Sequence, residues 1–133
     1  MVNIVEEKYK IIFLQTASNY LKKLQQSVVV LIHDPENTSV IEDAYLAAHS
    51  LKSENLMMQY KNLATFFLLL ENMFKARRDK TFTFTKEALI IINDEIEKIL
   101  SAVPKMVNEN QPYDVTATYQ KLKELSGMTV EEL

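Results

Sequence analysis

The feature that most constrains this chain is its lack of residues that interrupt helices. Its 133 residues include one glycine and three prolines, whereas a fold of many short strands needs turn residues roughly every 8–12 positions. Apolar residues recur three and four positions apart over long stretches, which is the spacing of one face of an α-helix. The sequence therefore predicts an all-α fold.

Four long segments carry this pattern, at about 4–33, 41–52, 61–78 and 86–107. Pro35 ends the first segment, because a proline disfavours helical geometry in the residue before it. Ser39, followed by Glu42 three residues later, is predicted to cap the second segment as a capping box. Residues 53–60 are compatible with either more helix or a tight connection.

The fourth segment is predicted to start after Thr83 or Thr85 and to end or kink near Val103, where Pro104 follows. The preceding residues 79–84 alternate between polar and aromatic residues like a strand. A six-residue run without a partner strand cannot form a sheet. We therefore expect a loop whose phenylalanines pack on the helices.

A short fifth helix is predicted at 115–125, capped by Asp114 and closed by Gly127. Short connections make neighbouring helices antiparallel, so the prediction is an up-and-down four-helix bundle with a short fifth C-terminal helix. The length suits one domain, which we assign to 1–127, with 128–133 as a tail or the start of a linker.

Composition excludes several classes of function. The net charge is only −3 with both signs mixed along the chain, which argues against nucleic-acid binding and against a membrane surface. No cysteine is present, so disulfides, thiol catalysis and cysteine metal sites are excluded. The two histidines lack the carboxylate spacing of a metal site. No signal sequence or membrane span is recognisable, and we expect a soluble, cytoplasmic protein.

One group of polar residues is a candidate functional site. His49 lies in the second helical segment with Lys52 three residues later, which places both side chains on adjoining turns of one helix face. Glu71 lies in the third segment, which can pack beside the second. An isolated helical histidine is more often a surface residue, and His33 is read simply as a cation at a helix end.

His49 and Glu71 each lie within a short sequence motif. The segment Ala48-His49-Ser50-Leu51-Lys52, with Leu70-Glu71-Asn72 following at a spacing of 22 residues from histidine to glutamate, resembles the histidine-containing phosphotransfer domain at the N-terminus of the chemotaxis histidine kinase CheA. The opening helix and the turn Asp34-Pro35-Glu36 are also similar. The resemblance extends from about residue 9 to about residue 125.

The resemblance implies a phosphocarrier in two-component signalling. His49 would accept the γ-phosphoryl group of ATP from a kinase ATP-binding domain, in the same or another chain, and pass it to an aspartate of a response regulator receiver domain. Lys52 would lie beside the phosphoryl group, and Glu71 would orient the imidazole. The domain itself would bind no cofactor, because ATP and magnesium come through the partner domains, and an isolated domain would be monomeric.

The chemistry of these residue types is consistent with those roles. A neutral imidazole is nucleophilic near pH 7. A carboxylate at Nδ1 would fix the tautomer, and a lysine one turn away would screen the phosphoryl charge. A single glycine leaves no glycine-rich nucleotide loop. Residues expected at a partner surface are Tyr45, Leu46, Ser53 and Lys75, with a smaller contribution from the basic helix end at Arg77 and Arg78.

The chain also departs from the family pattern. Ser53 stands where a glycine is usual, Leu56 and Gln59 replace further glycines, and Leu68 stands where a second histidine is common. These changes are expected to affect the efficiency of transfer rather than the fold. The alternatives are a free-standing phosphotransfer protein, a helical interaction module of the same fold that no longer transfers phosphate, and a plain helical adaptor.

Overall fold

The computed structural model describes residues 6–130, and over these residues the fold is all-α, as predicted. Its helices are α1 (Glu7–His33), α2 (Ile41–Met57), α3 (Lys61–Arg78), α4 (Lys86–Asn108) and α5 (Thr116–Ser126), with one 3₁₀ turn, η1 (Thr38–Val40), before α2. The predicted start of the first helix near Ile4 lies outside the described residues.

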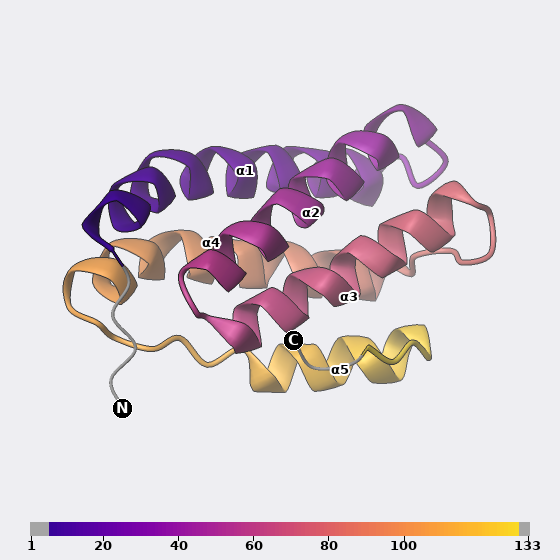
Figure 1. Ribbon diagram of the computed structural model, residues 1–133. Coiled ribbons are helices and arrows are strands. Elements are labelled where there is room, and N and C mark those ends of the chain that lie inside the picture. The colour runs from indigo at the N-terminus through magenta and orange to yellow at the C-terminus, as the bar shows by residue number, and fades with distance from the viewer. Residues whose placement is uncertain (1–5, 131–133) are drawn as a thin grey trace.

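The four long helices run side by side in alternating directions (Figure 1). Helix α1 packs against α2 and α4, and α2 packs along the length of α3. The short helix α5 lies across α3 and α4. The predicted bundle with a fifth C-terminal helix is confirmed.

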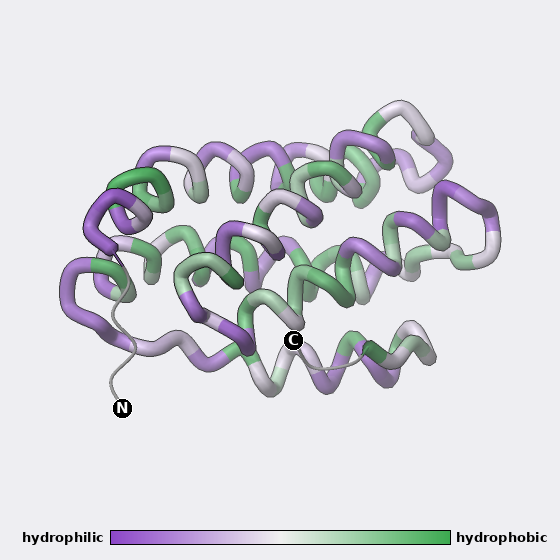
Figure 2. The backbone as a smooth tube through the Cα atoms, in the orientation of Figure 1, coloured by the Kyte–Doolittle hydropathy of each residue, from purple (hydrophilic) through white to green (hydrophobic). Residues whose placement is uncertain are grey.

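Helix α3 is the most deeply enclosed element. Its predicted inward residues are all buried (Leu63, Phe66, Phe67, Leu70, Met73 and Phe74), and the hydrophobic colour in Figure 2 covers much of its length. On α2 the buried face carries Ala44, Ala47 and Ala48. Because these side chains are small, α2 can lie close to its neighbours, which brings polar groups on α2 and α3 within direct contact.

The connection after α3 packs on the bundle as predicted. Phe84 is buried, and its ring centroid lies 5.0 Å from that of Phe74 and 5.0 Å from that of Phe82. The connection before α5 is anchored differently, because the Tyr113 hydroxyl donates to the buried carboxylate of Glu95 on α4. Burial, together with this carboxylate, raises the pKa of Tyr113 above its ordinary value.

Two of the predicted helix ends are correct, and the third, at Asp114, is displaced by one residue, because Val115 is the N-cap of α5 and makes no side-chain cap. Thr85, rather than Thr83, caps α4 by accepting a hydrogen bond from the Ala88 amide at 3.1 Å. Asp114 accepts one from the Thr116 amide at 2.9 Å, although α5 begins one residue later than predicted. Gly127 closes α5 with a φ of 68°, and its amide donates to the Lys123 carbonyl.

The predicted capping box at Ser39 is wrong. The Asn37 side-chain oxygen accepts hydrogen bonds from both the amide and the hydroxyl of Ser39, at 3.0 and 2.6 Å. This captures the Ser39 hydroxyl within the 3₁₀ turn, and α2 begins two residues later without a side-chain cap. Helix α4 extends to Asn108, close to its predicted end at 107, and Pro104 lies inside it on the exposed side. Of the two outcomes predicted for Pro104, an end near Val103 does not occur.

Helix α2 continues past Lys52 to Met57 and ends in a Schellman motif. The Tyr60 amide donates to the Asn55 carbonyl at 2.8 Å, and the Gln59 amide donates to the Leu56 carbonyl at 2.9 Å. Gln59 has a φ of 65°, in the left-handed region that glycine adopts at least cost. The turn geometry is thus one that suits glycine, although the residue is glutamine.

We predict that Gln59→Gly stabilises the fold by about 0.5–1 kcal/mol, because it removes the left-handed strain of a residue with a Cβ. Urea unfolding followed by circular dichroism measures the change. Lys98→Gly, on the exposed surface of α4, is the control and should destabilise by about 1 kcal/mol. A lower stability for Gln59→Gly would contradict this account of the turn.

Among residues 6–130, no helix is long and apolar enough to cross a bilayer.

Candidate functional site

The structure brings His49, Lys52 and Glu71 into one cluster between α2 and α3. The Nδ1 atom of His49 lies 2.6 Å from Oε1 of Glu71. The Nζ atom of Lys52 lies 2.8 Å from Oε2 of the same carboxylate. One turn of α2 therefore supplies a separate partner to each oxygen of a single carboxylate on α3.

Burial differs sharply within the cluster. The side chain of Glu71 is 8% exposed and that of Lys52 is 19% exposed, whereas that of His49 is 52% exposed. A carboxylate this deeply buried is costly unless it is paired, and both of its oxygens are paired here. The carboxylate is therefore held inside the fold while the imidazole stands at the surface.

This contact determines which imidazole nitrogen carries the proton. An ionised carboxylate only accepts hydrogen bonds, so the short contact assigns the proton to Nδ1, which donates to Glu71. In the neutral ring, Nε2 then holds the free lone pair. Because the ring is half exposed, this nucleophilic nitrogen is accessible from outside the protein.

The residues expected at a partner surface differ in their exposure to solvent. Leu46, Ser53 and Lys75 are exposed, as expected for a partner surface, but Tyr45 is half-buried and packs against the core. Their part in binding a partner stays a prediction. Leu68, at the position where the family often has a histidine, is half-buried on α3.

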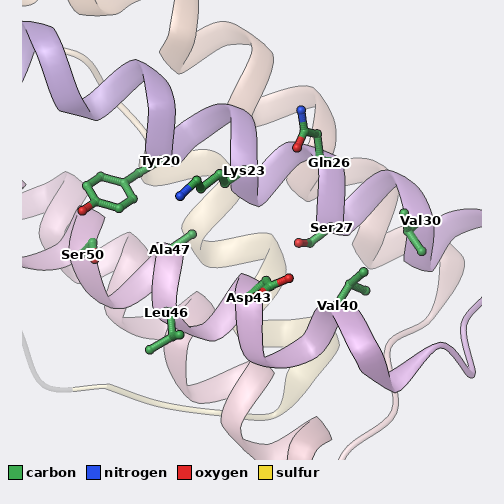
Figure 3. Close-up of a pocket in the computed structure, with 10 residues that line it drawn as sticks. All are labelled: Tyr20, Lys23, Gln26, Ser27, Val30, Val40, Asp43, Leu46, Ala47 and Ser50. Carbon is green, nitrogen blue, oxygen red and sulfur yellow. The ribbon is translucent and has the colours of Figure 1, made fainter.

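A groove lies between α1 and α2 (Figure 3), and no residue of the cluster lines it. Leu46 and Ser50, which flank His49 in sequence, line it from α2, and Tyr20 and Lys23 line it from α1. Leu46 is 51% exposed, the largest exposed fraction of any large hydrophobic side chain in the described part of the chain. The groove is a concave, partly apolar surface on the α1 side of the helix that carries His49.

Sequence reasoning named Tyr45 as a surface residue near His49, but it did not identify the contact between the two rings or the cation that lies over the Tyr45 ring. The planes of the Tyr45 and His49 rings differ by 25°. The Arg78 guanidinium lies over the Tyr45 ring, with its central carbon 4.8 Å from the ring centroid. The four-residue spacing from Tyr45 to His49 is a signal that could have indicated the first contact. The contact from Arg78 depends on how α2 and α3 pair, which no local pattern records.

Among residues 6–130, no three His, Cys, Asp or Glu side chains converge as ligands for a metal ion.

Comparisons with known proteins agree with the resemblance seen in the motifs. The chain is 26% identical over 101 residues to the chemotaxis protein CheA of Bacillus subtilis (strain 168), which is 76% of this chain and 15% of the relative. It is 26% identical over 103 residues to CheA of Borreliella burgdorferi, which is 77% of this chain and 11% of the relative. The chain thus spans only a small part of the length of these relatives.

The similarity in fold covers nearly the whole of both chains. The solution structure of the histidine phosphotransfer domain of CheA superposes with a TM-score of 0.78 at 25% identity, covering 96% of this chain and 98% of that one. No model of a known protein family matches the chain. In sequence and in fold, the chain is similar to the CheA histidine phosphotransfer domain.

We predict that Glu71→Met shifts His49 away from the Nδ1–H tautomer, because methionine has a similar size but offers no strong acceptor. The ¹⁵N chemical shifts of the two ring nitrogens, measured where the ring is neutral, report the tautomer. Glu54→Gln is a matched control on α2, since Glu54 bonds to Thr16 rather than to His49. An unchanged tautomer in Glu71→Met would contradict the assignment of the proton.

Proposed function

We propose that this chain is a histidine phosphotransfer domain of chemotaxis signalling. In this proposal His49 accepts a phosphoryl group from a kinase ATP-binding domain and passes it to an aspartate of a response regulator receiver domain. The observation that carries the proposal is the contact of His49 Nδ1 with the buried Glu71 carboxylate, which leaves Nε2 nucleophilic at the surface. The similarity to CheA supports the same reading.

The first step is attack by Nε2 on the γ-phosphorus of ATP. The Nε2–P bond forms while the bond from phosphorus to the bridging oxygen breaks, and ADP leaves with that oxygen. The proton on Nδ1 stays in place, so the ring becomes positively charged. The Glu71 carboxylate, 2.6 Å from Nδ1, stabilises this charge as it develops.

Lys52 contributes positive charge on the same side of the imidazole. It is bonded to Glu71 at 2.8 Å and is about one-fifth exposed, so its ammonium group offsets the charge of the carboxylate that also contacts the imidazole. Phosphoryl transfer depends mostly on positioning and on neutralising charge. Lys52 therefore offsets the repulsion that the Glu71 carboxylate would exert on a phosphoryl dianion.

The second step returns the imidazole to its starting state. A carboxylate oxygen of the receiver aspartate attacks phosphorus, the Nε2–P bond breaks, and its electron pair returns to Nε2. The product is an aspartyl phosphate on the receiver and a neutral His49 with its proton still on Nδ1. No proton has to enter or leave the site in either step.

The domain itself would supply neither ATP nor magnesium. ATP and magnesium would be bound by the kinase and receiver domains, in the same or another chain, and the reactions would take place in the cytoplasm. The chain matches only 15% and 11% of its two curated relatives, which is consistent with the proposal that ATP is bound by another domain. The isolated domain is proposed to act as a monomer.

The direct test is labelling by a CheA ATP-binding domain with radioactive ATP. We predict an acid-labile, alkali-stable phosphate on the wild type and none on His49→Gln. His33→Gln is the matched control, because His33 lies at the far end of α1 and should label like the wild type. No labelling of the wild type, by a kinase that phosphorylates its own phosphotransfer domain, would favour an interaction module without transfer.

A second prediction concerns Lys52. We expect Lys52→Gln to slow labelling roughly tenfold or more, since it removes the cation next to the phosphoryl group. Lys98→Gln, an exposed lysine of α4, should have no effect. Equal rates for Lys52→Gln and the wild type would show that the lysine serves only to pair the buried Glu71.

A further inference from the structure

We propose that Tyr45 is a positioning residue for His49 and that Arg78 holds Tyr45 in place from the neighbouring helix. The proposal rests on the proposed function, since it concerns how the phosphoryl-accepting ring is aimed. It adds a second restraint on the imidazole, beyond the hydrogen bond that Nδ1 donates to Glu71.

The first observation is the contact between the two rings. The centroids of Tyr45 and His49 lie 6.4 Å apart with 25° between the ring planes, which is an offset stacked arrangement within the usual range for aromatic pairs. The two residues are four positions apart on α2, so they share one face of the helix. The Tyr45 ring thus limits the rotation of the imidazole toward the N-terminus of α2.

The second observation is a cation that holds the tyrosine. The guanidinium carbon of Arg78 lies 4.8 Å from the Tyr45 ring centroid, a distance typical of a cation–π contact. Arg78 Nη1 also donates to Glu42 Oε2 at 3.1 Å. Glu42 lies three residues before Tyr45 on α2, so the arginine of α3 is tied to the same helix face that carries both rings.

The reason for a second restraint lies in the geometry of the first. His49 is 52% exposed, and one hydrogen bond to Nδ1 leaves the ring able to pivot about the Nδ1–Oε1 line. Such a pivot would swing Nε2 away from the line of attack. A face contact with Tyr45 opposes this motion, and transfer needs Nε2 aligned with the phosphorus.

The two helices contribute in a regular pattern. Glu71 and Arg78 are seven residues apart on α3 and therefore two turns apart on one face. On α2, the residues involved are Glu42, Tyr45, His49 and Lys52, spaced three, four and three residues apart. The outer edge of the α2–α3 contact thus carries polar and aromatic side chains over three turns, with the imidazole bonded to Glu71 and its ring stacked near that of Tyr45.

The test uses phosphoramidate as the donor, so that no partner protein has to dock. In this reaction the N–P bond of phosphoramidate breaks, ammonia leaves with a proton from the solvent, and the Nε2–P bond forms on His49. We expect Tyr45→Leu to slow phosphorylation about three- to tenfold. Tyr45→Phe keeps the ring and should react like the wild type, because the contact involves the ring and not the hydroxyl.

A double-mutant cycle tests the role of Arg78. Arg78→Ala should slow the reaction two- to threefold on its own and have no further effect in the Tyr45→Leu background, since it acts through the ring. Arg78→Lys tests the alternative of a simple charge effect on the donor. If charge alone matters, Arg78→Ala stays harmful without Tyr45, and this outcome overturns the role of Arg78. A loss of rate in Arg78→Lys would show in addition that the planar guanidinium is needed, because lysine keeps the charge.

A measurement without phosphorylation separates this proposal from the proposed function. Three-bond NMR couplings report the χ1 rotamers of His49, which should be one dominant rotamer in the wild type and in Tyr45→Phe but averaged in Tyr45→Leu. Unchanged couplings and an unchanged rate in Tyr45→Leu would overturn the positioning role while His49 still labels. A wild type that fails to label, with couplings that still change, would instead refute phosphotransfer alone.

Discussion

The buried carboxylate of Glu71 is the constraint on which the site depends. With 8% of its side chain exposed, this group is held in a place where a carboxylate without partners would be strongly destabilising. Its partners are His49 and Lys52, which lie on adjoining turns of α2. Because a shift of α2 by one residue would move both partners away, the carboxylate links the pairing of α2 and α3 to the orientation of the imidazole.

The hydrophobic core fixes the helices that carry this cluster, although no core residue contributes a polar group to it. Helix α3 is buried on most of its surface, with Phe66 and Phe67 among its fully buried residues, and the small residues of α2 let the two helices lie close together. Loops play little part, since every residue of the cluster stands on a helix. A site on rigid helices keeps the nucleophilic nitrogen in one place while its open side faces a partner.

Much of the fold was predictable from local patterns. The bounds of α3 agree with the prediction at both ends, because a strongly periodic run is followed there by a basic end and a loop. The predictions failed where two local rules compete. The sequence predicts a helix cap at Ser39, but Asn37 accepts a hydrogen bond from its hydroxyl. The end of α2 stays open in the sequence because the polar residues after Lys52 suit both helix and loop. Pro104 lies inside α4 on its exposed side, where water can solvate the carbonyl that a proline leaves without an amide donor.

By itself, the sequence determined the helical class, the placement of His49 and Lys52 on one helix face, and, through resemblance, the pairing with Glu71. These follow from periodicity and spacing, which are properties of a single helix or of a known motif. Only the tertiary structure decided that Glu71 is buried while His49 is open, and that Arg78 reaches Tyr45. Burial and cross-helix contacts depend on how α2 and α3 pack, and packing is set by the whole core rather than by any short segment.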